Sequence, residues 1–324
     1  MSDPDNATTG SSEDVISKEN LRDFISSLPT REGWSVPLIE YNSYWFRPNI
    51  LERILLDKQG FIPRADDIIL ATQPKCGTTW LKALGFTIIN RCRYSFIDHP
   101  LLTGHPQHLV PSIEFPIAGS DFINIDALPS PRLLATHMPM SLLPPSTSSL
   151  GCRVVYLCRD PKDALVSRLH FENKVGEGSS ISTDSAFSMF CEGFSPFGPF
   201  WDHCLEYWKE SVARPDNILF LKYEELKSDP VQVVRRLAEF IGVPLTEEEE
   251  KSGVAQEVVR LCSFEMLTSL EVNQLGAGHR GYFSNSVFYR KGEVGDWKNH
   301  MSHEMGEKLD RIVQEKLQGS GLVF

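Results

Sequence analysis

Residues 72–80 read TQPKCGTTW and follow directly after the apolar run DDIILA (66–71). The run predicts a buried strand, and the loop behind it should lead into a helix. Backbone N–H groups at a helix N-terminus, the Lys75 ammonium and the hydroxyls of Thr78 and Thr79 are suited to hold an anion. Because Lys75 precedes Gly77, the loop is not a Walker A loop. The alternative is an ordinary strand-to-helix turn with Thr78 or Thr79 as N-cap.

Cationic residues recur in two other short stretches, RDPKD (159–163) and YRKG (289–292). Arg159 and, two turns into the next helix, Ser167 could face one bound phosphate. Asp160 could be a magnesium ligand of the Walker B type, but its position before Pro161 favours a helix N-cap. Each stretch alone is more often a solvated surface loop than a binding site.

His137 lies in the stretch THMP (136–139), directly after an apolar run. An imidazole has a pKa near neutrality, so His137 could act as a general base. A hydrogen-bonded structural histidine is the alternative. Three further histidines occur in HPLLTGHPQH (99–108), with no carboxylate or cysteine at metal-ligand spacing, and we therefore expect no metal site.

Four apolar runs are followed by loops and helical patterns, which predicts an α/β fold with a parallel sheet. The runs are DIILAT (67–72), RLLAT (132–136), RVVYLC (153–158) and NILFLK (217–222). The expected helices include LKALGFTIINRC (81–92), KDALVSRLHF (162–171) and PVQVVRRLAEFIG (230–242), and also FGPFWDHCLEYW (197–208) as a packed helix. Ligands bind at the carboxyl ends of such strands. Lys75, His137, Arg159 and Tyr223 are all expected at that edge.

Composition narrows the class of protein. Acidic residues outnumber Lys plus Arg by 43 to 32, giving a net charge of −11, which disfavours nucleic-acid binding. Seven cysteines without a CxxC pair indicate neither a disulfide framework nor a zinc site, and fit a reducing, cytoplasmic setting. The uncharged window 133–152 contains three prolines and is not expected to span a membrane. We predict a disordered acidic tail over residues 1–18 and one domain over residues 19–324.

Together, QPKCGTTWLKAL, ATHMP, RDPKDALVS and YRKGEVGDWKNH resemble the cytosolic sulfotransferases in order and spacing. WLKALGFTI, HPQHLVPSIEF and RLLATHMPMSLLP favour the plant branch. The resemblance covers about residues 30–315. It implies a P-loop-kinase-like sulfotransferase fold. It also implies metal-free transfer of a sulfuryl group from 3′-phosphoadenosine 5′-phosphosulfate (PAPS) to a hydroxyl of a small plant metabolite, with adenosine 3′,5′-bisphosphate (PAP) as product.

The resemblance also implies residue roles. Lys75 would act on the leaving phosphate and His137 as general base toward the acceptor. Asp163 and Asp296 resemble structural caps or loop anchors. The PAPS-binding residues would be Lys75, Cys76, Gly77, Thr78 and Thr79 at the phosphosulfate, Trp80, Tyr223 and Phe264 at the adenine, and Arg159, Ser167, Arg290, Lys291 and Gly292 at the 3′-phosphate. The expected acceptor-pocket residues are Tyr44, Trp45, Phe46, His108 and Phe171.

Three positions depart from the family pattern. Cys76 stands where Ser or Thr is usual in the family, and Cys262 stands where animal relatives have Thr. Ala135 replaces a Lys of the animal relatives, so Lys75 must supply more of the positive charge. Animal relatives dimerise through KxxxTVxxxE, which here reads KNHMSHEMGE (298–307), and a monomer is expected. The acceptor could be a flavonoid or other phenolic, a steroid, a hydroxyjasmonate or a desulfoglucosinolate. A P-loop-like nucleotide kinase and a non-catalytic nucleotide-binding protein are the competing functions.

Overall fold

The computed structural model describes residues 18–115, 125–176, 180–275 and 284–324. The tail predicted over residues 1–18 therefore lies outside the described residues, except for Lys18, the first residue of helix α1 (Lys18–Ser26). Among the described residues, no helix combines the length and apolar character needed to cross a membrane. All seven cysteines are free thiols.

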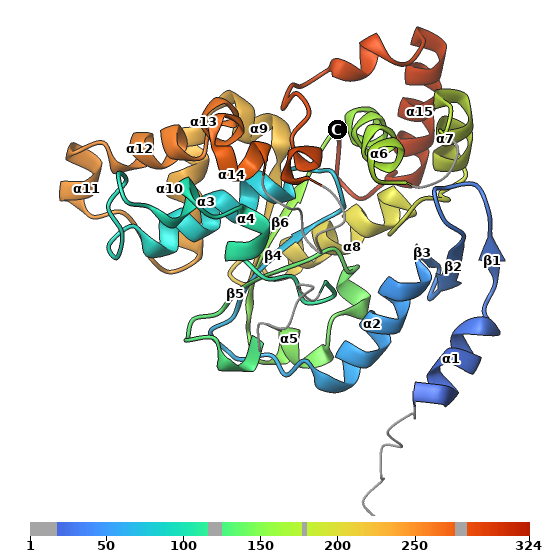
Figure 1. The fold of residues 1–324 in the computed structure, drawn as a ribbon, viewed down its shortest axis with the longest axis horizontal. Coiled ribbons are helices and arrows are strands. Elements are labelled where there is room, and N and C mark those ends of the chain that lie inside the picture. The colour runs from blue at the N-terminus through green and yellow to red at the C-terminus, as the bar shows by residue number, and fades with distance from the viewer. Residues whose placement is uncertain (1–17, 116–124, 177–179, 276–283) are drawn as a thin grey trace, which may run out of the picture.

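A four-stranded parallel sheet occupies the centre of the molecule, in the order β5-β4-β6-β7 (Figure 1). Its strands are β4 (Ile68–Thr72), β5 (Leu133–Thr136), β6 (Arg153–Cys158) and β7 (Ile218–Lys222). Each of the four predicted strands is confirmed, and each begins within one residue of its predicted start. The runs are apolar throughout because both faces of the sheet are covered. The predicted α/β fold is therefore confirmed.

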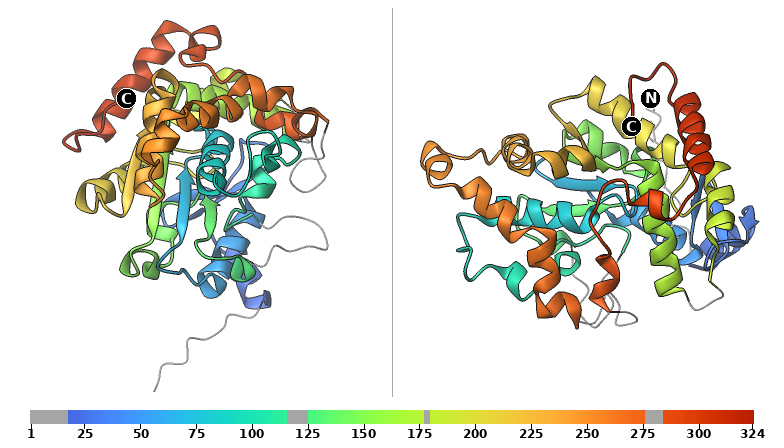
Figure 2. Two further views of the ribbon diagram at one scale, coloured as in Figure 1. Left: turned by 90° about the vertical axis from the view of Figure 1, so that its left-hand side faces the viewer. Right: turned by 90° about the horizontal axis from the view of Figure 1, so that it is seen from above.

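Alternate residues of each strand enter one of two separate hydrophobic cores. Ile68 and Leu70 of β4 pack against helices α3 (Thr78–Asn90), α10 (Pro230–Phe240) and α12 (Val254–Leu261). Ile69 and Ala71 belong to the opposite core, with α2 (Pro48–Gly60), α6 (Pro161–Val175), α8 (Phe200–Ala213) and α15 (His303–Lys316). The two groups of helices lie on opposite sides of the sheet (Figures 1 and 2).

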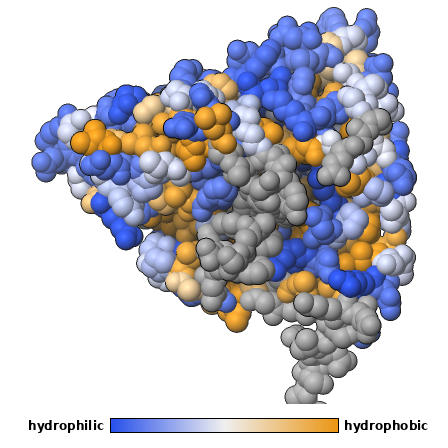
Figure 3. All heavy atoms as spheres, viewed as in Figure 1, coloured by the Kyte–Doolittle hydropathy of each residue, from blue (hydrophilic) through white to orange (hydrophobic). Residues whose placement is uncertain are grey.

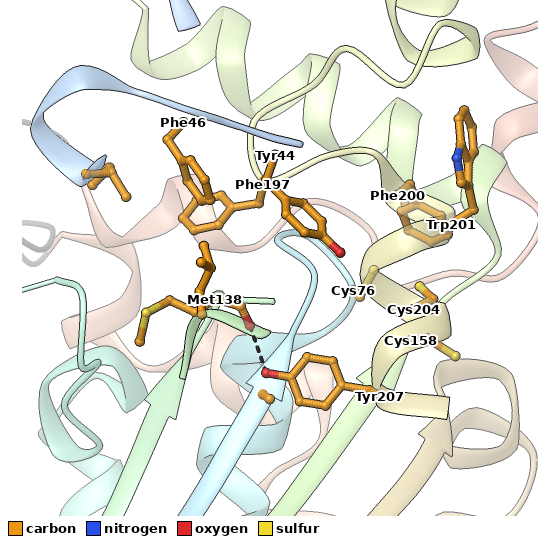
Figure 4. Packing of buried hydrophobic residues seen from close by; sticks show 14 of the residues in the cluster. Tyr44, Phe46, Cys76, Met138, Cys158, Phe197, Phe200, Trp201, Cys204 and Tyr207 are labelled. Carbon is orange, nitrogen blue, oxygen red and sulfur yellow. Dashed lines mark hydrogen bonds between the residues drawn. The ribbon is translucent and has the colours of Figure 1, made fainter. Parts of the chain in front are cut away.

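The predicted helices over 81–92, 162–171 and 230–242 correspond to α3, α6 and α10. The aromatic stretch 197–208 forms most of α8, whose buried residues include Phe200, Trp201 and Tyr207. Figure 4 shows Tyr207 lying over the strands of the sheet, with its hydroxyl donating a hydrogen bond to the carbonyl of Met138 at 2.7 Å. This hydrogen bond ties the segment that contains His137 to α8.

Polar side chains cap several helices. Asp160 accepts hydrogen bonds from the backbone N–H groups of Lys162 and Asp163, so it is the predicted N-cap of α6. Thr246 forms a capping box with Glu249 at the start of α11 (Glu247–Lys251). Figure 3 shows hydrophilic side chains gathered at the tip that contains this helix. His99 and His105 cap the short helices Pro100–Leu102 and α4 (Pro106–Leu109) through their Nδ1 atoms.

A second, antiparallel sheet was not expected from the sequence. Its strands are β1 (Thr30–Arg31), β2 (Leu38–Tyr41) and β3 (Tyr44–Phe46), in that order. They are too short to produce a clear alternating pattern. The remaining α-helices are α5 (Pro145–Ser149), α7 (Thr183–Cys191), α9 (Tyr223–Ser228), α13 (Phe264–Ser269) and α14 (Glu271–Gln274). Short 3₁₀ helices span Ile125–Ala127, Met140–Leu142, Asn285–Phe288 and Asp296–Asn299.

Candidate active site

The loop between β4 and α3 lies where the strand order changes direction, with β5 on one side of β4 and β6 on the other. Gly77 precedes α3 with φ of 106°, in the left-handed region. A Cβ atom at Gly77 would lie 2.9 Å from the Tyr223 ring, so only glycine fits there. Because α3 begins at Thr78 after Gly77, neither Thr78 nor Thr79 is its N-cap, and the alternative of a threonine-capped turn is wrong.

This loop forms one wall of a cavity of about 410 Å³, a volume typical of sites for small molecules. Most residues that the sequence assigned to PAPS or to catalysis line it. They are Lys75, Gly77, Thr78, Thr79, Trp80, His137, Arg159, Ser167, Tyr223, Phe264, Arg290, Lys291 and Gly292. Cys76 does not line the cavity: its side chain is fully buried and its N–H group donates to the carbonyl of Gln73 at 3.2 Å.

Three cations come together at one end of the cavity from segments more than 130 residues apart in the chain. The Arg159 guanidinium donates to the carbonyl of Glu293 at 2.5 Å. Arg290 and Lys291 each contact one oxygen of Asp296, at 2.5 and 2.7 Å. The buried carboxylate of Asp163 on α6 anchors the same segment by accepting hydrogen bonds from the backbone N–H groups of residues 295 and 297, at 2.8 and 3.0 Å.

Aromatic rings surround the neighbouring part of the cavity. The rings of Trp80 and Tyr223 meet edge to face at 5.4 Å between centroids. Phe264 packs so close to Gly292 that a Cβ atom at residue 292 would lie 2.8 Å from the ring. Gly292 has φ of 67°, so close approach and backbone conformation both require glycine. Trp80, Tyr223 and Phe264 all line the cavity, and aromatic rings are suited to pack on a nucleobase.

Three polar atoms of the cavity lining are buried without a hydrogen-bond partner: Trp80 Nε1, Arg159 Nε and the Tyr289 hydroxyl. Buried polar groups are normally satisfied, so unsatisfied ones around a cavity indicate a polar ligand. Together with the glycine-lined walls, these atoms fit a nucleotide that carries several phosphate oxygens.

The Lys75 ammonium lines the cavity and lies 4.2 Å above the centroid of the Phe171 ring. Burial, with the guanidinium of Arg168 nearby, lowers the pKa of Lys75 to about 7. A bound anion would reverse this effect, since a negative charge favours the protonated lysine. Phe171 lines the cavity, as the sequence predicted for this residue.

His137 is held in one tautomer. Its Nδ1 atom lies 2.8 Å from the backbone carbonyl oxygen of Thr72, and a carbonyl can only accept, so Nδ1 carries the proton. Nε2 is therefore the atom with the free lone pair. Burial, with the nearby cations Lys82 and Arg168, lowers the pKa of His137 to about 3, and the ring stays neutral near pH 7.

A buried polar group fixes the backbone around His137. The carboxylate of Glu114 accepts hydrogen bonds from the His137 N–H group at 2.6 Å and from the Thr136 hydroxyl at 2.9 Å. Lys82 is also fully buried, and its ammonium donates to Gln107 at 2.5 Å and to Ser112 at 2.9 Å. Burial raises the pKa of Glu114 to about 7 and lowers that of Lys82 to about 7.

Comparison with known proteins agrees with this geometry. Residues 65–321 match the family model described as "Sulfotransferase domain". The chain belongs to the sulfotransferase family. Cytosolic sulfotransferase 6 of Arabidopsis thaliana is 44% identical, covering 96% of each chain, and flavonol 4′-sulfotransferase of Flaveria chlorifolia is 42% identical, covering 94% of this chain and 97% of the other. Mouse sulfotransferase SULT7A1, solved as a complex with PAP, superimposes with a TM-score of 0.68 at 26% identity, over 87% of this chain and 95% of the other.

The protein is thus a PAPS-dependent sulfotransferase. The prediction of its acceptor pocket is wrong for four residues, Tyr44, Trp45, Phe46 and His108, which do not line the cavity. Tyr44 and Phe46 are buried in the core, where the Tyr44 hydroxyl donates to Glu206 and Phe46 packs on Phe197. Figure 4 shows Tyr44 and Phe46 within this core. Trp45 packs edge to face on Phe194 at 4.8 Å, and His108 on His105 at 5.9 Å.

Cys262 and Ala135, the two positions outside the phosphosulfate loop that differ from the family pattern, have different surroundings in the sulfotransferase. Cys262 lines the cavity, and its thiol lies 3.3 Å from the Thr87 hydroxyl. Ala135 is buried in the core, with Ser112 paired beside it. The Lys82 ammonium contacts this same Ser112, so a cation lies next to the position where animal relatives have a lysine.

Other lining residues of the sulfotransferase were not identified from the sequence. They include Arg47, Gln107, Ser112, Phe115, Arg168, Pro196 and Phe197. Phe115 and Phe197 pack on the His137 ring, at 5.8 and 5.6 Å between centroids. One signal was available: Arg168 directly follows Ser167, so a helix that presents the serine to a phosphate also brings this arginine near the site.

Proposed function

We propose that this sulfotransferase transfers the sulfuryl group of PAPS in line to a hydroxyl of a small plant metabolite, with His137 as general base. The acceptor belongs to the flavonoid or other phenolic, steroid, hydroxyjasmonate or desulfoglucosinolate class. PAPS supplies the sulfuryl group and PAP leaves as the product. His137 Nε2 takes the proton of the acceptor hydroxyl as that oxygen forms its bond to sulfur. Lys75 stabilises the charge that develops on the bridging phosphate oxygen as the S–O bond breaks.

One observation carries this proposal. The hydrogen bond from His137 Nδ1 to Thr72 leaves Nε2 as a proton acceptor in the cavity that also contains the Lys75 ammonium. A base and a cation that line the same cavity suit proton removal at the acceptor and charge stabilisation at the leaving group. A binding-only protein does not need this base, and neither a nucleotide kinase nor a binding-only protein needs a cationic group for a 3′-phosphate.

We also propose residue roles for PAPS. Lys75, Thr78 and Thr79 hold the phosphosulfate, Trp80, Tyr223 and Phe264 contact the adenine, and Arg159, Ser167, Arg290, Lys291 and Gly292 hold the 3′-phosphate. The three buried atoms without partners in the cavity lining support this assignment. For the whole protein we propose a cytoplasmic monomer that binds no nucleic acid and no membrane. The net charge of −11 supports the absence of nucleic-acid binding, and the names of the cytosolic relatives support the proposed location.

Binding of two nucleotides tests the proposal. Charge-assisted hydrogen bonds contribute roughly 1.5–3 kcal/mol each. Two or three of them should favour PAP over adenosine 5′-monophosphate (AMP) by about 3–6 kcal/mol, or roughly 10²–10⁴ in affinity. Calorimetry should show this preference for the wild type, and Arg159→Ala should remove much of it.

A matched variant, Arg236→Ala, changes the same charge on the exposed part of α10 and should retain the preference for PAP. If the wild-type protein binds PAP and AMP with equal affinity, the assigned 3′-phosphate site is wrong and the proposed function loses its support.

A further inference from the structure

Two arginines that the nucleotide assignment does not use line the acceptor side of the cavity. Arg168 is on α6, one residue after Ser167, and Arg47 directly follows strand β3. Both pair with a single carboxylate, that of Glu172. The side chain of Glu172 is 0% exposed, that of Arg168 is 8% exposed and that of Arg47 is 28% exposed. A cation as strongly buried as Arg168 requires compensation by charge or by hydrogen bonds, and the partly buried Arg47 competes for the same carboxylate.

Compensation within the cluster is incomplete. Among the residues that the structure describes, the two guanidinium groups share one carboxylate, which leaves one positive charge without an ionic partner there. Glu172 Oε2 is occupied by Arg47 and by the Ser35 hydroxyl, which lies 2.5 Å away. The pKa of Glu172 is below its ordinary value, because the attraction of the two arginines outweighs the opposing effect of burial. The carboxylate is therefore ionised and cannot balance both cations.

Arg168 is the less satisfied of the two. It donates to Glu172 Oε1 and to the carbonyl of Pro196, both at 3.4 Å. These distances exceed the usual 2.7–3.2 Å of N–H···O hydrogen bonds. A guanidinium has five donors in a fork that matches the geometry of an oxyanion. Burial lowers the pKa of Arg168, which is a further sign that the surrounding protein compensates its charge poorly.

The cluster lies beside the reacting groups. Pro196, which accepts from Arg168, precedes Phe197, and the Phe197 ring packs on His137 at 5.6 Å. Phe197 also packs on Phe46, the residue before Arg47. The contacts therefore run from the proposed base along one wall of the cavity to both arginines. Glu265 is the carboxylate among the lining residues, and it follows Phe264 at the adenine end.

We infer that the acceptor of this sulfotransferase carries an oxyanion, such as a carboxylate, and that Arg168 and Arg47 bind it while the acceptor hydroxyl lies at His137. This inference rests on the proposed function and narrows its substrate class. Arg168 and Arg47 are then residues that determine specificity, and Glu172 holds both in place. A neutral acceptor of similar size would leave the unpaired charge buried against an apolar group.

Matched pairs of phenols test the inference. The probes are 4-hydroxybenzoate, 4-hydroxyphenylacetate, 3-(4-hydroxyphenyl)propanoate and 4-(4-hydroxyphenyl)butanoate, each compared with its methyl ester. Sulfation with PAPS gives kcat/KM, and calorimetry in the presence of saturating PAP gives affinity without turnover. For at least one acid, kcat/KM and affinity should exceed those of its ester by about 10- to 100-fold, which corresponds to the free energy of one charge-assisted hydrogen bond.

Variants should change the acid-to-ester ratio in opposite directions. Arg168→Met should lower it about tenfold or more, whereas Glu172→Gln removes the competing carboxylate and should raise it. Arg236→Met, the same substitution on exposed α10, should leave the ratio as in the wild type. Because two variants change the ratio in opposite senses, loss of folding by one of them does not remove the test.

If no acid in the series binds or reacts better than its ester, the inference is overturned. An Arg168→Met protein that keeps the acid preference and loses only affinity for PAP would also overturn it, since Arg168 would then act on the donor. Failure of the proposed function is a separate result, because it appears as equal binding of PAP and AMP.

Discussion

His137 combines two properties that suit a base: a fixed tautomer and a neutral ring. The Thr72 carbonyl orients Nδ1–H, and Glu114 holds the backbone N–H group of the same residue. The Nε2 lone pair is available near pH 7, because burial keeps the pKa far below neutrality. An acceptor anion or the phosphosulfate would add negative charge beside the ring and raise this pKa, which makes proton uptake easier in the loaded enzyme.

We expect His137→Ala to lower kcat by about 10²–10⁴-fold, the usual contribution of general base catalysis. The affinity for PAP should change little, because the imidazole faces the acceptor. Steady-state kinetics with labelled PAPS measures the first quantity and calorimetry the second. An unchanged kcat would remove His137 from the mechanism, and a large loss of PAP affinity would indicate a structural role.

Lys75 should take up a proton when the nucleotide binds. Because the pKa of Lys75 is about 7, most of this lysine is neutral at pH 8 before the nucleotide binds. The bound 5′-phosphate raises that pKa, so binding at pH 8 draws up to about one proton from solution. The affinity for PAP should therefore fall as the pH rises above 7.

Calorimetry of PAP binding at pH 8 in Tris and in HEPES measures the uptake, because the two buffers differ in their enthalpy of ionisation. The observed enthalpies should differ for the wild type and agree for Lys75→Met. Equal enthalpies in both buffers for the wild type would contradict the predicted shift.

At the level of elements, the N-terminus of α6 and the segment 289–297 form one unit through Asp163. This carboxylate is fully buried, accepts from two backbone N–H groups of the segment and lies 3.4 Å from the Arg159 guanidinium. Neither Arg290 nor Lys291 lies on α6, so this anchor determines where their side chains reach the cavity. The interpretation of Asp163 as a loop anchor is consistent with these contacts.

Asp163→Ala should therefore reduce the preference for PAP over AMP by about 10-fold or more, because each N–H group left unsatisfied costs about 1–3 kcal/mol and the segment moves. Asp160→Ala is the matched control on the same helix: it removes the N-cap, costs about 1 kcal/mol of stability and should leave the preference intact. Calorimetry with both nucleotides and thermal unfolding of each variant separate the two effects. Equal loss of preference in both variants would mean that helix stability alone is responsible.

For the molecule as a unit, the C-terminal segment 298–307 bears on assembly. Ser302 is the N-cap of α15 and accepts from the backbone N–H group of Met305 at 3.2 Å, while the His303 side chain is largely exposed. The surface over α15 is mostly hydrophilic in Figure 3. An exposed polar pair replaces the Thr-Val pair of the animal motif, so the segment offers little apolar area for a partner.

We expect a monomer at micromolar concentration, measured by sedimentation velocity. The double substitution Ser302→Thr with His303→Val restores the animal pattern and should increase association, since threonine still caps the helix and valine adds apolar surface. A tight dimer of the wild type would show that the subunits meet elsewhere.

Local features of the chain were sufficient to predict the frame of the site. The run RVVYLC predicts a strand by its periodicity, the glycine after Lys75 predicts a turn by its backbone conformation, and Asp160 before Pro161 predicts a helix N-cap. All three effects depend only on neighbouring residues. The general rule for parallel sheets then brought Lys75, His137 and Arg159 to one edge. These expectations agree with the folded structure because few tertiary alternatives are compatible with four buried parallel strands.

The acceptor side of the cavity depends on contacts between distant segments and could not be predicted in this way. Tyr44 and Phe46 have the composition of a binding wall, yet the short β3 strand turns both into the core. Arg47 directly follows β3, Arg168 and Glu172 lie on α6, and nothing local distinguishes the three from surface charges. Only the tertiary contacts of Arg47 with Glu172 and of Arg168 with the loop at Pro196 bring them together. Burial in one cavity makes a binding site of these charged residues, because charges that have lost their solvating water require a partner of opposite charge.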